Sequence, residues 1–246
     1  QLPAPIISNF KTSKGETIAI YDWPLQTGQK SRGTALLVHG LGEHIGRYAH
    51  VAQHLNQWGY SVRGYDHFGH GLSTGVRGGL LSDNQLLDDL DVMLLQARQN
   101  MPANEKLVLV GHSMGGGVVG RFVSMHPERV DALVMSSPAL DGGLNAIQKL
   151  LLSTLPKIAP NLRVGNGLDP RFISHDESMV AAYTSDPLVH DRISARLGRF
   201  IVNNGAEVIA SASNWRVPTL LMFAGQDKLV SPAGSRAFAT NAPSCV

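Results

Sequence analysis

The sequence predicts an α/β fold with a mostly parallel sheet, flanking helices and a helical cap inserted late in the chain. Short apolar runs rich in β-branched residues alternate with helical patterns, which is typical of a parallel sheet covered on both faces. The alternation breaks between Asp141 and Arg216, where helical patterns and prolines occur without a convincing strand. We therefore expect residues 1–140 and 217–246 to form the sheet domain and residues 141–216 to form the cap.

Seven short apolar runs are expected to form the strands of this sheet. Lys14-Gly15 joins the first two runs as a hairpin-like turn. The seven runs cover residues 6–10, 17–23, 35–38, 60–65, 107–110, 132–135 and 219–223.

The helices expected between these strands cover residues 47–58, 83–99 and 114–125. In the second helix, apolar residues recur at helical spacing and place one stripe against the sheet: Leu86, Leu87, Leu90, Met93 and Leu94. Ser231-Pro232 is typical of a helix N-terminus, so we expect a short helix to about Thr240. Cys245-Val246 is expected to begin another strand.

The composition is that of an ordinary globular protein with no sign of a nucleic-acid partner. Of 246 residues, 43% are hydrophobic and 16% are charged, and the net charge is +2 without a block of like charges. The one cysteine, Cys245, excludes an intrachain disulfide, and no His-x-x-x-His pair or carboxylate cluster indicates a metal. We expect no cofactor. Without a signal peptide or a long apolar run, the sequence predicts a cytoplasmic protein.

The segment Gly111-His112-Ser113-Met114-Gly115 has the pattern of a catalytic nucleophile. It follows an apolar run and precedes a helical pattern, and a strand, G-x-S-x-G and a helix in that order form a nucleophile elbow. Glycines two residues on either side of Ser113 leave room for a strained turn, where a β-carbon would collide with backbone. The alternative is a buried turn serine. The context predicts that Ser113 is the nucleophile.

Four segments carry a resemblance to a known family. They are residues 39–44 (HGLGEH) with Arg47-Tyr48, 66–73 (DHFGHGLS), 111–116 (GHSMGG) and 186–190 (DPLVH). In this order, they resemble the α/β-hydrolases of the monoacylglycerol lipase and lysophospholipase type, which are serine aminopeptidase S33-like. The resemblance covers essentially the whole chain. It implies an α/β-hydrolase fold whose last strand and helix are missing from this chain.

The resemblance also implies roles for the loop that follows residues 35–38. It assigns the oxyanion hole to the backbone N–H groups of Leu41 and Met114, which would stabilise charge that develops only in the tetrahedral intermediate. From the residues alone, Leu41 is equally compatible with a core-facing position. The loop at residues 66–73 is expected to be a structural turn near the site. The residues expected to shape or brace the oxyanion loop are His39, Gly40, Glu43, His44 and Arg47.

Two aspartates are candidates for the acid of a catalytic triad. Asp227 lies just after residues 219–223, where the family places its acid, and Gly225 supplies a turn there. Asp141 follows the preceding strand, where some other α/β-hydrolases have theirs. The family match favours Asp227, whose carboxylate would hold the tautomer of the base. The plainer alternative for Asp227 is a solvated loop aspartate.

The base of the triad is not found where it is expected. In this fold the order along the chain is serine, acid and then histidine, yet all ten histidines, from His39 to His190, precede Asp227. Three explanations stay open. The natural protein continues beyond Val246 and supplies the histidine, a cap histidine such as His175 or His190 substitutes, or the protein binds a ligand without catalysis. We expect the first.

The cap carries most of the information about the substrate. Its apolar run lines an acyl tunnel above Ser113, contacts a lipid interface, or packs on the body of the cap. With the resemblance, it predicts a serine hydrolase for esters of single-acyl-chain lipids, with transient membrane contact through the cap. The alternatives are a peptidase or amidase of the proline-iminopeptidase kind and a catalytically silent ligand-binding protein. The run consists of Ile147, Leu150, Leu151, Leu152, Leu155 and Ile158.

Overall fold

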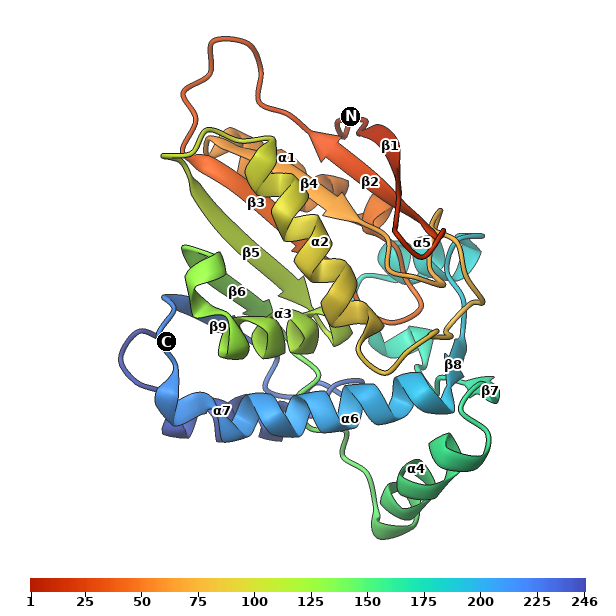
Figure 1. Ribbon diagram of the computed structural model, residues 1–246. Helices are drawn as coiled ribbons and strands as arrows, with labels where there is room; N and C mark the ends of the chain where they lie inside the picture. The colour runs from red at the N-terminus through yellow and green to blue at the C-terminus, as the bar shows by residue number, and fades with distance from the viewer.

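A central sheet of seven strands organises the molecule (Figure 1), in the order β1-β2-β4-β3-β5-β6-β9. The computed structural model describes residues 1–246 except for the side chain of Ile147, so that this member of the apolar run lies outside the described residues. The strands are β1 (Ile6–Lys11), β2 (Thr17–Trp23), β3 (Gly33–Val38), β4 (Tyr60–Tyr65), β5 (Lys106–His112), β6 (Ala132–Ser136) and β9 (Thr219–Met222).

The sheet is mostly parallel, as predicted. β4, β3, β5, β6 and β9 run in the same direction, whereas β1 and β2 form an antiparallel hairpin that adds to β4. All seven expected strands are present, with ends that differ by at most three residues from the expectation. Because the parallel strands share one direction, their carboxyl ends meet at one edge of the sheet, where ligands bind in folds of this type.

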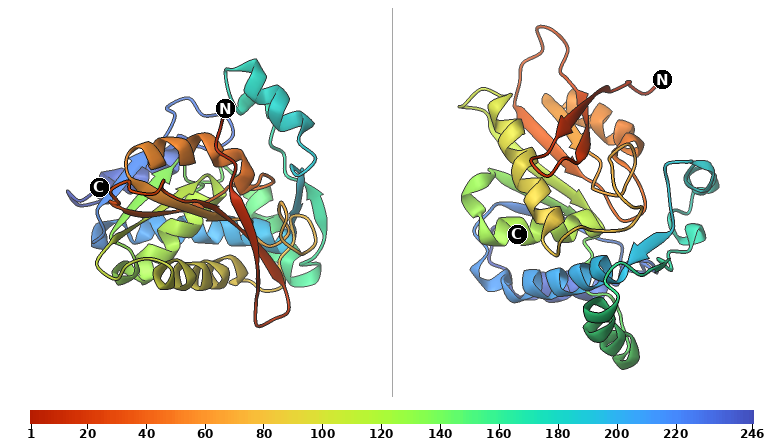
Figure 2. Two further views of the ribbon diagram at one scale, coloured as in Figure 1. Left: turned by 90° about the horizontal axis from the view of Figure 1, so that it is seen from above. Right: turned by 45° about the vertical axis from the view of Figure 1, so that its right-hand side comes forward.

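Helices cover both faces of the sheet (Figure 2). α1 lies on one face, and α2 and α3 lie on the other. Alternate residues of each strand supply the two cores: Leu36 and Val38 of β3 join the larger core under α2 and α3, and Ala35 and Leu37 join the smaller core under α1. The helices are α1 (Ala49–Gln57), α2 (Gln85–Gln99) and α3 (Met114–Met125).

The segment expected to form the cap lies between the neighbouring strands β6 and β9. It contains α4 (Ala146–Ile158), β7 (Arg163–Gly165), α5 (Glu177–Ser185), β8 (Arg192–Ser194) and α6 (Ala195–Ala210). α4 projects from the rest of the molecule, whereas α6 packs along α3 (Figure 1). The expectation of no strand in this segment was wrong, because β7 and β8 pair as a small antiparallel sheet. Each has three residues and β7 is exposed, so neither shows an apolar alternation.

The C-terminal segment differs from the sequence expectation at its last residues. α7 (Pro232–Asn241) forms with Ser231 as its N-cap, as expected. The expected strand at Cys245 does not form: the Cys245 carbonyl accepts the N–H of Thr219 beside β9, but the Val246 N–H turns back to Pro243. Within the described residues, no helix combines the length and the apolar character needed to cross a membrane. Short 3-10 helices complete the chain at Ile45–Tyr48, Pro127–Arg129, Pro170–Phe172 and Ala212–Asn214.

Candidate active site

Ser113 lies on a strained turn at the carboxyl edge of the sheet, between β5 and α3. Its φ of 55° and ψ of −118° are rare for a residue with a side chain. Both of its backbone polar groups are held: the N–H donates to Ser136 (3.0 Å), and the carbonyl accepts the N–H groups of Gly117 (3.2 Å) and Ala139 (2.9 Å). The turn is therefore fixed by the neighbouring strand end, and it has the geometry of a nucleophile elbow.

The glycines of the elbow are needed for the close contact between β5 and α3. A β-carbon on Gly115 would overlap the carbonyl oxygens of Val38 and His39 at the end of β3. A β-carbon on Gly111 would overlap the carbonyl of Gly115, and one on Gly116 would lie 2.8 Å from Cα of Pro138. These contacts are closer than side chains tolerate, so the three positions accept only glycine without a backbone shift.

The loop after β3 lies directly against the elbow. A β-carbon on Gly40 would lie 3.2 Å from Cβ of Ser113, so the absence of a side chain there allows the loop backbone to approach the serine. Leu41, Ser113 and Met114 all line the same cavity. Among the described residues, the N–H groups of Leu41 and Met114 find no protein acceptor. The Met114 N–H has no acceptor because Met114 lies in the first turn of α3, where N–H groups lack a helical partner.

Glu43 fixes the loop after β3 from within. Its carboxylate accepts the Gly40 N–H (2.9 Å), the Tyr48 hydroxyl (2.7 Å) and the Arg47 guanidinium (2.6 Å). Burial, with the nearby charge of Glu43, holds the pKa of Tyr48 well above its usual range, so its hydroxyl remains a donor. His44, expected in the same network, pairs instead with Asp186 of the cap segment (2.6 Å).

Replacing Glu43 by alanine is expected to destabilise the protein by about 3 kcal/mol, because it leaves three buried or half-buried donors without their acceptor. Chemical unfolding at neutral pH measures this loss. Tyr48→Phe removes only one of the three hydrogen bonds and should cost about 1 kcal/mol. Equal stability of Glu43→Ala and the wild type would contradict the bracing role of this carboxylate.

Four histidines form a cluster beside this loop: the buried His39, His67 and His70, and the half-buried His190. The His39 and His67 ring centroids are 4.3 Å apart, and those of His70 and His190 are 4.7 Å apart. The His39 Nδ1–H donates to the Gly40 carbonyl (2.6 Å) and its Nε2 accepts the His67 N–H (3.0 Å), which fixes a neutral ring. In the part of the chain that the structure describes, no three His, Cys, Asp or Glu side chains are placed to share a metal.

Burial keeps the rings of this cluster neutral. It lowers the pKa of His67 to about 4 and holds the pKa values of His39 and His70 well below their usual range, with neighbouring rings as a second cause for His39 and His70. These rings therefore act as hydrogen-bonding parts of the loop.

Asp227 lies at the same edge of the sheet as Ser113, in the loop that follows β9. Its carboxylate accepts the N–H groups of Leu229 (2.9 Å) and Val230 (3.0 Å), and these two residues line the cavity of Ser113. Asp141, the other candidate acid, also lines this cavity, and its carboxylate accepts the Gly143 N–H (2.9 Å).

No histidine of the described chain meets Ser113 or either candidate acid. The ten side chains are all described, and none forms a hydrogen bond with Ser113, Asp141 or Asp227. His112, next to Ser113 in the chain, pairs with the Ser136 hydroxyl (3.1 Å). His190 bonds Gly69 through Nε2 (3.1 Å), and the exposed His175 does not line the cavity.

The cavity above Ser113 has a volume of about 280 Å³ and a mostly apolar wall. The sheet domain supplies Ser113 with its neighbours at the base. The cap supplies the sides, with Leu144, Leu152, Leu155, Leu162, Val164, Leu168, Ile193, Ile201 and Val202. Asp141 is the one carboxylate in the described lining. The arrangement can hold an alkyl chain whose polar end reaches the serine and the two free N–H groups.

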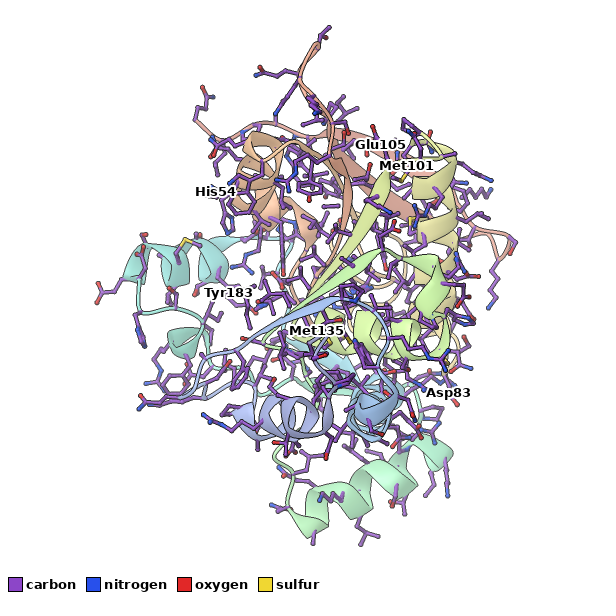
Figure 3. All side chains as sticks on the ribbon, turned by 90° about the vertical axis from the view of Figure 1, so that its left-hand side faces the viewer. His54, Asp83, Met101, Glu105, Met135 and Tyr183 are labelled. Carbon is purple, nitrogen blue, oxygen red and sulfur yellow. The ribbon has the colours of Figure 1, made fainter. Side chains whose placement is uncertain are left out.

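Residues 183–190 contact the loop after β3, and the sequence did not reveal this contact. The His190 N–H donates to the carbonyl of Gly42 (2.9 Å), next to Leu41. Tyr183, labelled in Figure 3, packs against the Arg47 guanidinium at 4.8 Å, beside the Asp186–His44 pair. The motif at residues 186–190 marked this segment, but its partners lie some 140 residues earlier and carry no local signal.

The sequence model of the family described as serine aminopeptidase, S33, matches residues 29–246. The chain belongs to this family. A curated relative, the monoacylglycerol lipase of Mycolicibacterium smegmatis, is 36% identical over 221 residues, which are 88% of this chain and 78% of the relative. The family assignment confirms the resemblance drawn from the four sequence segments.

Solved structures show that this S33 member has the α/β-hydrolase fold that the sequence predicted. The monoacylglycerol lipase of Paleococcus ferrophilus is 34% identical, with a TM-score of 0.82 over 92% of this chain and 84% of that one. A soluble variant of the monoglyceride lipase of Saccharomyces cerevisiae, solved with a substrate analogue, is 25% identical, with a TM-score of 0.89 over 99% of this chain and 84% of that one.

Proposed function

We propose that this S33 protein is a serine hydrolase that cleaves carboxylic esters of lipids with a single acyl chain, such as a monoacylglycerol or a lysophospholipid. One observation carries the proposal: a strained serine and two free backbone N–H groups open into an apolar cavity lined by the cap. A relative from Mycolicibacterium smegmatis and two solved structures, all monoacylglycerol lipases by name, support the substrate class.

The proposed reaction is acyl transfer in two steps. Ser113 Oγ attacks the ester carbonyl and gives its proton to the base, while the carbonyl oxygen takes up negative charge. The N–H groups of Leu41 and Met114 stabilise this oxyanion, and each such donor is commonly worth about 3–4 kcal/mol in the transition state. The alcohol then leaves with the proton, and water hydrolyses the acyl-enzyme to release the fatty acid.

Asp227 is proposed as the acid that orients the base and stabilises its charged form. Its place after β9 puts it at the same edge of the sheet as Ser113. His39, Gly40, Glu43 and Arg47 are proposed as supports of the oxyanion loop. No base is proposed among the ten histidines described here, because none of them forms a hydrogen bond with Ser113. Every activity measurement below uses the natural protein.

A peptidase is the second candidate, because the family is described as serine aminopeptidase, S33. The cavity favours an ester. An aminopeptidase site needs acidic groups to hold the free amine of its substrate, and Asp141 alone in the described lining carries a negative charge. Its carboxylate is engaged by the Gly143 N–H. The remaining wall is apolar, which suits an acyl chain.

The test compares two substrate panels under the same conditions. One panel is a series of nitrophenyl esters together with a monoacylglycerol, and the other is a set of aminoacyl anilides. The proposal predicts ester hydrolysis at least a hundredfold above anilide hydrolysis. Preference for the anilides would establish the peptidase, and no turnover in either panel would establish a silent ligand-binding protein.

We further propose that α4 contacts a lipid surface while the substrate enters. Leu150, Leu151 and Ile158 leave 64%, 53% and 82% of their surface exposed, and they share this helix with Lys149 and Lys157. Exposed apolar side chains with nearby lysines suit an interface with anionic lipids.

Vesicle binding tests this contact. The double variant Leu150→Ser with Ile158→Ser is expected to lower the fraction bound to phosphatidylglycerol vesicles at least tenfold, since each buried side chain is worth about 2 kcal/mol. Leu95→Ser removes an exposed leucine from α2, on the sheet domain, and should leave vesicle binding unchanged. An equal loss of vesicle binding in the double variant and in Leu95→Ser would contradict a role for α4.

A further inference from the structure

We propose that Leu152 of α4 and Val202 of α6 form the end wall of the acyl cavity and set the acyl chain length beyond which binding gains no more affinity. This inference rests on the proposed function, because it names the acyl group that the same site accepts. The wall separates the apolar cavity above Ser113 from a charged groove. An alkyl chain is stable in the first space and gains little in the second, so its favourable contacts end at the wall.

The two wall residues each face two cavities. They line the apolar cavity above Ser113, and they also line a groove of about 1130 Å³ between α4 and the helices α2, α3 and α6. Leu152 reaches across to α6 at Gly198, where an added β-carbon would lie 3.1 Å from Leu152 Cδ2. The leucine thus fills the space that the glycine leaves open, and it closes the cavity at this point.

The groove beyond the wall is charged. Asp83, labelled in Figure 3 near one end of α4, pairs there with Arg199 (3.1 Å) and Arg196 (3.4 Å), and Arg129 pairs with Asp91. An alkyl chain that passed the wall would displace water from these ions instead of burying its own surface in an apolar environment. Each further methylene would therefore gain little.

The wall therefore marks the length at which this happens. Before the wall, each methylene of an acyl chain is buried against apolar side chains of the cap. Beyond it, the chain meets the charged groove. We expect chains that are long enough to reach Leu152 and Val202 to gain no further affinity from added methylenes.

Binding of saturated fatty acids of six to sixteen carbons, measured by calorimetry, tests the wall without requiring turnover. For the wild type, the affinity should rise about fourfold with each methylene and then stop rising at one chain length within this series. Leu152→Ala removes three carbon atoms from the wall and should move this break about three carbons upward. Gly198→Ala adds a carbon to the wall and should move it downward, while favouring the helix intrinsically.

Leu95→Ala is the matched control, because Leu95 is an exposed leucine on α2 and lines neither cavity. In this variant, the chain length at which the affinity stops rising should equal that of the wild type. A wild-type series without a break, or an unmoved break in Leu152→Ala, would overturn the inference. The substrate panels decide the proposed function separately: a break that moves in Leu152→Ala, without ester hydrolysis by the wild type, would contradict that function and leave the wall intact.

Discussion

Replacing Ser113 by alanine is expected to lower ester turnover by about a million-fold, because loss of the nucleophile of a serine triad removes the covalent route entirely. The fold should survive. The backbone groups of Ser113 hold the elbow through Ser136, Gly117 and Ala139, and alanine keeps all of these bonds. The remaining activity would come from the oxyanion N–H groups and from binding, which the substitution leaves in place.

Steady-state hydrolysis of a monoacylglycerol, with circular dichroism and thermal unfolding on the same samples, measures this effect. Ser124→Ala serves as the control, since Ser124 lies at the far end of the same helix and its hydroxyl bonds only Arg121. It should retain wild-type turnover. If Ser113→Ala hydrolysed the ester within tenfold of the wild type, another nucleophile would have to be found.

Acidification from pH 7 to pH 5 is expected to lower the free energy of unfolding by roughly 3 kcal/mol, a large share of the total for a domain of this kind. The buried rings of His39, His67 and His70 have lowered pKa values, about 4 for His67, whereas the unfolded chain binds protons on these histidines below about pH 6.5. The unfolded state therefore binds more protons in this range, and stability falls as the pH falls.

Two carboxylates partly offset this loss of stability at low pH. Burial raises the pKa of Asp89 to about 7, with Asp88 as a second cause, so the folded chain takes up a proton there before the unfolded chain does. Asp66, whose pKa burial also raises, acts in the same sense. Three histidines lose about 1.4 kcal/mol each per pH unit below 6.5, and the opposing carboxylates leave a net loss.

His70→Asn isolates the contribution of one ring. The His70 Nδ1–H donates to the Phe68 carbonyl (2.9 Å), and an asparagine amide can keep that bond without titrating. Urea unfolding at pH 7 and pH 5 should show a smaller loss in this variant, by about 2 kcal/mol. His126→Asn, at an exposed position on the surface, should keep the wild-type loss. The same loss in His70→Asn as in the wild type would contradict the account.

The sequence predicted the parts of this molecule that depend on local pattern. α3 covers the predicted residues, β2 and β4 also match, and the elbow lies between β5 and α3 as expected, because apolar periodicity and glycine spacing are local signals. Leu41 was placed by family resemblance, and the structure brings it to the same cavity as Ser113.

Contacts between distant segments were not predictable in the same way. β7 and β8 are too short to show an alternation, and their pairing depends on a cap that folds around them. The Asp186–His44 pair joins residues 142 positions apart, and neither residue type indicates its partner. Tyr48 was visible as part of a motif, but its bond to Glu43 follows only from the turn between β3 and α1.

Mass spectrometry of the protein after reaction with a fluorophosphonate tests the central claim most directly, because this reagent forms a covalent bond with an activated serine. We predict one adduct per full-length chain, carried on the peptide that contains Ser113 and absent from Ser113→Ala. An adduct on a different residue, or undiminished labelling of Ser113→Ala, would contradict the assignment of Ser113 as the nucleophile.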